Sequence, residues 1–318
     1  MSVGANIRRR RAELRMSQQE LADAMGYKSR STIAKIESEE NDVSQKKLQR
    51  FAQVLDTTVE DLFFGYRAAA ITPTPESPVF DKTRSKNVAI ILAGGKTGKN
   101  LQSIPTQFIN VQGKPIFMYS MEVYQQHQSI DEIYVVCVRG WEQIVKDCAA
   151  QYNITKLRGI VLGGQSAVKS LRIAIDHIRK THGPDDIILI QEATRPKVTT
   201  EMVSTLLLAC EEKGTATFCH AMKDYVQFHV GASGTNYVDR NSLVALQSPE
   251  AHRLSLLCRL YDQALRQNHP LTESCCTMLL YHMGYDIHFI DSDINNIKLI
   301  RKADIAAFQA LIQAGFSY

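Results

Sequence analysis

A glycine turn that follows an apolar run is the first place in this sequence where phosphate chemistry could occur. Residues 90–92 are Ile-Ile-Leu and lead into Ala-Gly-Gly at 93–95. A second glycine pair, at 163–164, follows Val161 and Leu162. Glycines at the end of a buried strand let backbone N–H groups approach phosphate oxygens closely, and the start of a following helix favours the same anions. At 93–95, a tight strand-to-helix turn without any ligand is the alternative.

A carboxylate and a guanidinium follow a third apolar run. Residues 186–190 read Asp-Ile-Ile-Leu-Ile, and Glu192 and Arg195 come shortly after them. The two side chains could act on a bound ligand. They could also form a structural ion pair at a strand end, because such pairs arise without function.

Four buried-strand runs must position these groups: residues 88–92, 132–137, 159–162 and 186–190. Each is followed by a loop and then by a helical period, which is typical of a parallel, doubly wound α/β sheet. Such sheets bind ligands in the crevice beyond the carboxyl ends of their strands. The loops after Leu92, Leu162 and Ile190 are therefore predicted to carry the chemistry.

The composition narrows the class of protein. The net charge of +4 is too small to argue for nucleic acid by itself. The seven cysteines are odd in number and form no C-x-x-C pair, so they are predicted to be reduced, mostly buried thiols. His220 and His252 show no metal-ligand spacing either. No apolar run is long enough to span a bilayer, which predicts a cytoplasmic protein with no membrane partner.

The first 65 residues predict short amphipathic helices. Ser17-Gln-Gln-Glu20 is a capping box, in which the Ser17 hydroxyl and the Glu20 carboxylate satisfy backbone N–H groups at a helix start. That helix is predicted to end at Gly26, and Ser29 is predicted to cap another whose isoleucines face inward. The residues left outward on this next helix suit phosphates and base edges in a DNA major groove: Arg30, Ser31, Thr32 and Lys35.

Residues 16–22, 29–37 and 48–63 resemble the lambda-repressor/Cro-like (XRE) helix-turn-helix family. The resemblance implies an all-α, five-helix domain that binds double-stranded DNA as a homodimer, with Gln18 gripping a phosphate. A protein-binding helical bundle is the alternative, because fold does not fix function. The arginine run at 8–11 could equally be a solvated helix face.

Three segments are predicted along the chain: a DNA-binding domain over 1–65, a linker rich in proline, threonine and serine over 66–86, and an α/β domain over 87–318. The last of these resembles the cytidylyltransferases that load methylerythritol phosphate or ribitol phosphate onto CTP. The glycine turns and residues 105–108, 113–115, 192–196, 238–241, 247–249 and 296–298 carry the resemblance in an ordered series.

That resemblance implies a Rossmann-like, doubly wound nucleotidyltransferase domain. It assigns the cytidine nucleotide to Ala93, Gly94, Gly95, Lys96, Lys99, Gly163, Gly164 and Ser170. It assigns the alditol phosphate to Arg195, Arg240, Ser248 and Thr272. In an active enzyme Lys99 and Lys298 would be catalytic, and Glu192 would hold Mg²⁺ once a nucleotide is bound.

The expected triphosphate loop is incomplete. Thr97 stands where the family has a glycine, Lys99 where it has an arginine, Thr106 where it has a lysine, and Ala167 where a further arginine is expected. Nucleotidyl transfer depends mainly on electrostatic stabilisation, so each lost donor costs on the order of a hundredfold or more in rate.

We therefore interpret the chain as a transcription regulator that senses a cytidine nucleotide, an alditol phosphate or a CDP-alditol. Two alternatives stay open. One is an active CTP-dependent cytidylyltransferase that also binds DNA, with Lys96 or Lys99 replacing the lost cations. The other is a ligand-free dimerisation scaffold.

Overall fold

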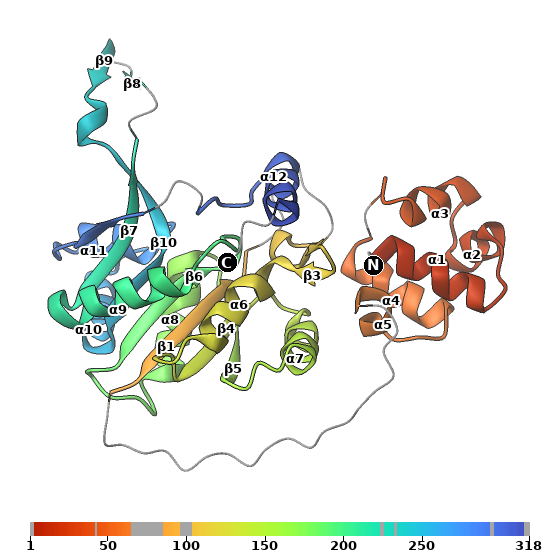
Figure 1. Cartoon of the computed structure of the whole chain (residues 1–318), viewed down its shortest axis with the longest axis horizontal. Helices are drawn as coiled ribbons and strands as arrows, with labels where there is room; N and C mark the ends of the chain where they lie inside the picture. Colours follow the sequence, from red (N-terminus) through yellow and green to blue (C-terminus); the bar gives the residue numbers. More distant parts are fainter. Residues whose placement is uncertain are drawn as a thin grey trace. The chain divides into compact units, whose positions relative to one another are not determined.

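The structure is a computed structural model, and it describes residues 3–41, 43–64, 85–95, 104–222, 226–231, 234–292 and 296–314 (Figure 1). The chain divides into two compact units, of which one contains the N-terminal helices and the other the central sheet. Most of the predicted linker falls within 65–84, outside the described residues. No helix in the described ranges is long and apolar enough to cross a bilayer.

The N-terminal helices confirm the predicted five-helix domain. They are α1 (Val3–Glu13), α2 (Gln18–Met25), α3 (Arg30–Glu37), α4 (Gln45–Val54) and α5 (Val59–Phe64). The capping box forms as expected, because Ser17 Oγ accepts from Glu20 N at 3.1 Å and Glu20 Oε2 accepts from Ser17 N at 2.7 Å. Gly26 ends α2 with a φ of +76°, which a glycine adopts without strain. The core of the domain consists of fully buried apolar residues that include Ile7, Leu21, Ile33, Leu48 and Phe51.

A seven-stranded sheet forms the centre of the second domain, in the order β11-β7-β10-β6-β1-β4-β5. Its strands are β1 (Asn87–Ala93), β4 (Glu132–Cys137), β5 (Leu157–Leu162), β6 (Ile187–Glu192), β7 (Thr215–Ala221), β10 (Val244–Arg253) and β11 (Phe289–Asp291). The four predicted strands pair in parallel, as expected. The sheet is nevertheless mixed, because β10 lies antiparallel to both β6 and β7.

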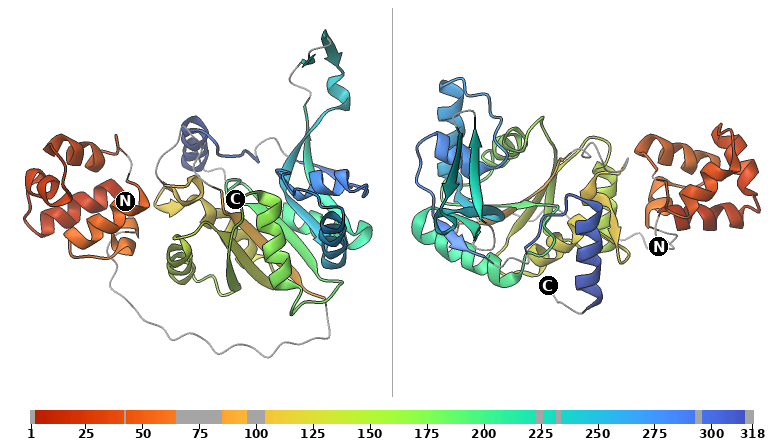
Figure 2. Two further views of the ribbon diagram at one scale, coloured as in Figure 1. Left: turned by 180° about the vertical axis from the view of Figure 1, so that it is seen from behind. Right: turned by 90° about the horizontal axis from the view of Figure 1, so that it is seen from above.

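Helices cover both faces of the sheet, which confirms the doubly wound architecture (Figures 1 and 2). They are α6 (Ile116–Gln126), α7 (Glu142–Gln151), α8 (Ala167–Ile178), α9 (Thr200–Lys213), α10 (Leu254–Arg266) and α11 (Cys276–His282). One more helix, α12 (Lys302–Gln313), belongs to the other compact unit. Side chains alternate along a strand, so Val88 and Ile90 of β1 pack with α8, α10 and α11 in one buried cluster. Burying each such side chain stabilises the fold by about 1.5–3 kcal/mol.

The remaining short elements of the chain are η1 (Thr106–Phe108), β2 (Asn110–Val111), β3 (Lys114–Pro115), β8 (Gln227–Gly231), β9 (Gly234–Val238) and η2 (Arg240–Ser242). β8 and β9 pair only with each other, as a hairpin that projects away from the main sheet (Figure 1). All seven cysteines are free and five are buried, as the composition predicts.

Candidate functional site

A carboxylate and two cations meet beyond the carboxyl end of β6. Glu192 is the last residue of the strand, and its Oε2 accepts a 2.8 Å hydrogen bond from Arg195 Nε. Its Oε1 is bonded by Lys298 Nζ, from the segment that precedes α12. The Glu192, Arg195 and Lys298 side chains are 26%, 12% and 38% exposed, so a ligand can reach them. Three residues predicted for the site thus form one ion-pair network.

Ser248 and Asn296 hold the backbone segments that carry this network. Ser248 Oγ accepts from the Glu192 N–H at 3.0 Å, and Arg195 Nη1 donates to the Asn296 carbonyl at 2.6 Å. Asn296 is only 2% exposed and donates from Nδ2 to the Ser248 carbonyl at 2.7 Å. Asn296 therefore ties the segments of Ser248 and Arg195 together. No role of its own was predicted for Asn296 from the sequence. Its position in the motif at 296–298, two residues before Lys298, was the signal that could have indicated one.

Gln191 holds the loop between Glu192 and Arg195. This side chain is fully buried, and its Nε2 donates to the backbone carbonyls of Glu192 and Arg195, both at 2.9 Å. Its Oε1 accepts from the hydroxyl of Tyr124, a fully buried residue of α6, at 3.1 Å. Groups of the protein itself therefore hold this loop, as a preorganised electrostatic site requires.

The two glycine turns meet at the carboxyl ends of β1 and β5. A Cβ placed on Gly94 would lie 3.7 Å from the Gly163 Cα atom. A Cβ on Gly163 would lie 3.2 Å from Ser170 Oγ, so the serine side chain would have to shift by a few tenths of an ångström. The same Oγ accepts the Gly164 N–H at 2.9 Å, and Ser170 is 5% exposed. Ser170 thus shapes the turn from within α8, and Ala93 is buried in the strand.

The rest of the predicted triphosphate loop is only partly visible. Gln107 is buried and donates from Nε2 to the Gly95 carbonyl at 2.9 Å, which fixes the end of the first turn. Lys96 and Lys99 lie within 96–103, outside the described residues, so their assignment stays a prediction.

Arg240 and Thr272 lie on other segments. Arg240 is exposed and begins η2, next in the chain to the β8–β9 hairpin. Thr272 is exposed in the connection between α10 and α11. Their assignment to the alditol phosphate also stays a prediction.

The predicted DNA-reading residues lie on α3. Arg30, Ser31 and Lys35 are exposed and Thr32 is partly exposed, whereas Ile33 and Ile36 are buried, as the helical spacing predicts. Gln18 is partly exposed at the start of α2, and its Nε2 donates to Glu37 Oε2 at 2.9 Å. A phosphate contact from Gln18 would have to use its second amide N–H.

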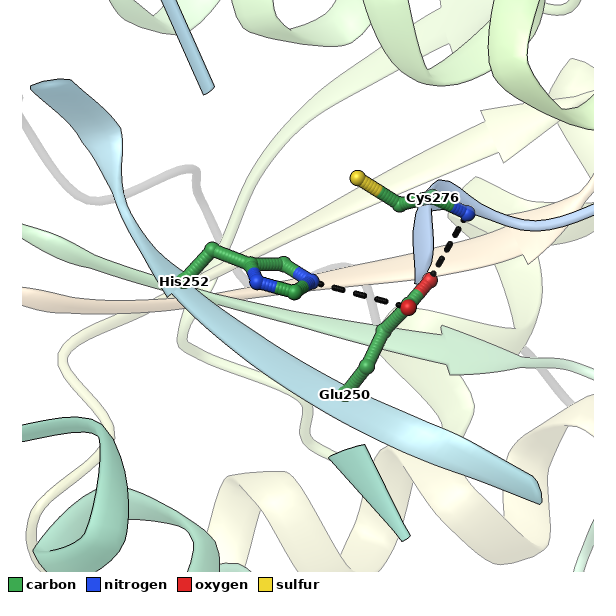
Figure 3. A group of neighbouring side chains, drawn as sticks. All are labelled: Glu250, His252 and Cys276. Atoms are coloured by element: carbon green, nitrogen blue, oxygen red, sulfur yellow. Dashed lines mark hydrogen bonds and ion pairs between the residues drawn. The ribbon is translucent and has the colours of Figure 1, made fainter. Parts of the chain in front are cut away.

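A buried cluster of Glu250, His252 and Cys276 escaped sequence reasoning, because its members come from β10 and the start of α11 (Figure 3). Glu250 accepts the backbone N–H groups of Cys276 at 3.2 Å and Thr277 at 3.0 Å, together with the Thr277 hydroxyl. Burial raises the pKa of the Cys276 thiol well above its usual value, which disfavours the thiolate that metals bind. The donors to Glu250 and the protonated thiol indicate a buried cap for α11.

Comparison with known proteins matches each of the two domains to a protein family. Residues 87–314 match the sequence model of the 2-C-methyl-D-erythritol 4-phosphate cytidylyltransferase family. The chain belongs to this family. Residues 7–62 match a helix-turn-helix family, which confirms the N-terminal resemblance.

Individual members of the cytidylyltransferase family align over nearly their whole length. A ribitol-5-phosphate cytidylyltransferase of Lacticaseibacillus paracasei is 31% identical over 227 residues, which cover 71% of this chain and 97% of the relative. A 2-C-methyl-D-erythritol 4-phosphate cytidylyltransferase of Clostridium botulinum is 26% identical over 230 residues, covering 72% and 98%.

Solved structures share the fold. The 4-diphosphocytidyl-2C-methyl-D-erythritol synthase of Anaerococcus prevotii superposes with a TM-score of 0.60 at 21% identity, over 72% of this chain and 96% of that one. The corresponding Francisella tularensis enzyme gives a TM-score of 0.58 at 19% identity, over 70% of this chain and 100% of that one.

Proposed function

We propose that this protein is a DNA-binding transcription regulator whose cytidylyltransferase domain binds a cytidine nucleotide, an alditol phosphate or the joined CDP-alditol. The observation that carries the proposal is the network of Glu192, Arg195 and Lys298 beyond β6, in a chain that also has a helix-turn-helix domain. Two cations held at the ligand-binding end of the sheet suit a phosphorylated ligand.

Ligand binding changes the partners of these cations. Arg195 and Lys298 are bonded to the Glu192 carboxylate. A ligand phosphate competes for them with charge-assisted hydrogen bonds of the same kind. Mg²⁺ is usually held by one or two carboxylates together with substrate phosphates, so Glu192 fits it only when a nucleotide supplies the remaining oxygens.

A homodimer would connect the ligand to DNA. Helix-turn-helix readers bind two half-sites as symmetric dimers, so the geometry between two α3 helices decides DNA affinity. The β8–β9 hairpin offers an apolar pairing surface, since Phe228, Val230 and Tyr237 are 56%, 76% and 59% exposed. A ligand then regulates DNA binding through its different affinities for the DNA-competent and incompetent dimers.

A second candidate function is an active cytidylyltransferase that also binds DNA. It is favoured by the survival of Arg195, Lys298 and an acidic residue at 192 in one network, and by the 31% identity to a ribitol-5-phosphate cytidylyltransferase. This candidate requires Lys96 or Lys99 to supply the charge that the family loop draws from other positions.

One set of measurements separates these functions. The full chain is incubated with CTP, Mg²⁺ and ribitol 5-phosphate or methylerythritol 4-phosphate, and released pyrophosphate is assayed. The sensor predicts no sustained turnover, together with thermal stabilisation by one of CTP, the alditol phosphates or CDP-ribitol. At a hundredfold excess over the dissociation constant, such a ligand stabilises the folded state by about 2.7 kcal/mol.

Two variants of neighbouring lysines give the matched comparison. Lys298→Ala should lose the ligand-induced thermal shift, while Lys302→Ala, an exposed lysine at the start of α12, should keep it. If the parent chain turns over substrate, and Lys298→Ala abolishes this turnover while Lys302→Ala leaves it intact, the chain is an active cytidylyltransferase and not a sensor. A chain that none of these compounds stabilises would be a dimerisation scaffold.

A further inference from the structure

Two histidines converge on one buried carboxylate at the α10–α11 connection. His269 Nε2 lies 3.2 Å and His282 Nδ1 lies 3.0 Å from Glu273 Oε1. His269 and Glu273 belong to the connection itself, and His282 ends α11. One ligand atom from each residue lies within 4.8 Å of the other two.

The carboxylate of Glu273 is desolvated and only partly satisfied. Its side chain is 3% exposed, and among the described residues its Oε2 has no hydrogen-bond partner. Glu273 therefore keeps one buried acceptor oxygen that a bound cation would satisfy.

We propose that His269, Glu273 and His282 form a binding site for a divalent transition-metal ion of the Zn²⁺ type. Imidazole nitrogens and a carboxylate oxygen are common zinc ligands, and three protein ligands leave a position for water. In a tetrahedral site with bonds of about 2.0–2.1 Å, ligand atoms stand about 3.3 Å apart. The observed separations of 3.2 and 3.0 Å are within a few tenths of an ångström of that value.

Solvent can reach the site from the histidine side. The side chains of His269 and His282 are 20% and 45% exposed, in contrast to the fully enclosed cluster at Glu250. A metal ion can therefore enter without unfolding the core. Glu273 and the two imidazoles would then supply its protein ligands.

Metal binding also acts on the neighbouring backbone. His269 Nδ1 accepts a 3.3 Å hydrogen bond from the Leu271 N–H, so a neutral His269 that keeps this bond carries its proton on Nε2. Coordination through Nε2 moves that proton to Nδ1, which can then no longer accept from Leu271. Leu271 has a φ of +53°, and its carbonyl accepts from Ser166 Oγ at 2.8 Å. Metal occupancy should therefore alter the segment that carries Thr272.

The test is a zinc titration of the untagged full chain against a chromophoric chelator. We expect one tightly bound Zn²⁺ per chain. Glu273→Gln and His282→Asn should each weaken binding by at least about a hundredfold, since even loss of a residue that supports a ligand costs ten- to a hundredfold. His177→Asn, an exposed histidine on α8, is the matched control and should bind like the parent chain.

Cobalt provides a second readout. Co²⁺ in a site of two imidazoles, one carboxylate and water should give visible absorption bands that disappear in His282→Asn, an exposed position whose replacement leaves the core intact. The proposal is overturned if the parent chain binds no stoichiometric Zn²⁺. It is equally overturned if Glu273→Gln and His282→Asn, with far-ultraviolet circular dichroism unchanged, bind Zn²⁺ as the parent does.

Discussion

Arg11 and Glu37 form a two-point ion pair inside the helix-turn-helix domain. Arg11 Nε donates to Glu37 Oε1 at 2.6 Å, and Arg11 Nη2 donates to Oε2 at 3.0 Å. Glu37 lies at the end of α3, and its side chain is 3% exposed. The pair therefore connects α1 to the helix that is predicted to read DNA, and the hydrogen bonds that Arg11 donates to Glu37 raise the pKa of Arg11.

Replacing Arg11 with methionine should destabilise the helical domain by about 3–5 kcal/mol, because it leaves the buried Glu37 carboxylate without its charged partner. Arg9→Met is the control, since Arg9 pairs with Glu13 on a surface where both side chains are at least 31% exposed. That change should cost less than about 1 kcal/mol. Urea unfolding followed by circular dichroism measures both, and equal losses would contradict a structural role for Arg11.

The double variant Arg30→Ala, Lys35→Ala should weaken binding to duplex DNA and make it less sensitive to salt. Each lost phosphate contact reduces the slope of log affinity against log salt by about 0.9. A salt titration by fluorescence anisotropy with a random-sequence duplex suffices, because this electrostatic contribution does not depend on base sequence. Lys180→Ala, an exposed lysine after α8, should change nothing. An unchanged slope in the double variant would place the DNA surface elsewhere.

Tyr124→Phe should destabilise the α/β domain by about 1–3 kcal/mol, because it removes the donor to Gln191 Oε1 and leaves that buried acceptor unsatisfied. It should also weaken binding of the stabilising ligand by loosening the loop of Glu192 and Arg195. Tyr281→Phe is the control, since Tyr281 is 71% exposed on α11. Denaturant midpoints and ligand dissociation constants are the measurements. If the two variants behave identically, the contact between Tyr124 and Gln191 does not hold the loop of Glu192 and Arg195.

Acid should destabilise the α/β domain through Glu132. Burial would raise the pKa of this carboxyl, but hydrogen bonds and charges from His182 and Lys86, 3.2 and 2.8 Å away, bring it down to about 2. A depressed pKa stabilises the fold above the ordinary value of 4.5, and the contribution is lost as pH falls from there toward 2. Its size is on the order of 3 kcal/mol.

Urea midpoints measured between pH 6 and pH 3 would reveal this contribution. Glu132→Gln should be less stable than the parent chain at pH 6 and should lose less stability on acidification. Asp286→Asn, at an exposed carboxylate, should follow the parent curve. If Glu132→Gln loses as much stability as the parent over this range, another carboxylate dominates the acid response.

Local sequence signals predicted the elements whose causes are local. The Ser17 capping box, the glycine at 26 and the apolar run of β1 each determine backbone structure within a few residues, and all three formed as expected. β10 was missed because its sequence, Val-Ala-Leu-Gln-Ser-Pro-Glu-Ala-His-Arg, mixes polar and apolar residues without a strict alternation. Its antiparallel direction follows from pairing with β6 and β7, which no local pattern specifies.

The sequence pointed to the members of the Glu192 network but did not indicate which of them contact one another. Family motifs pointed to Glu192, Arg195 and Lys298, yet the bond between Glu192 and Lys298 joins residues 106 positions apart. Gln191 and Tyr124 are 67 positions apart, and neither residue type signals the partnership. The arginine run was ambiguous for the same reason, because only the folded domain places Glu37 beside Arg11.

The charges of Glu192, Arg195 and Lys298 largely cancel one another. Two cations and one carboxylate give a net charge of +1, whereas α3 presents Arg30 and Lys35 on an exposed face. If the chain acts as we propose, added salt should therefore weaken its binding to DNA more than its binding to a small ligand, because cations compete with α3 for the phosphates of a duplex.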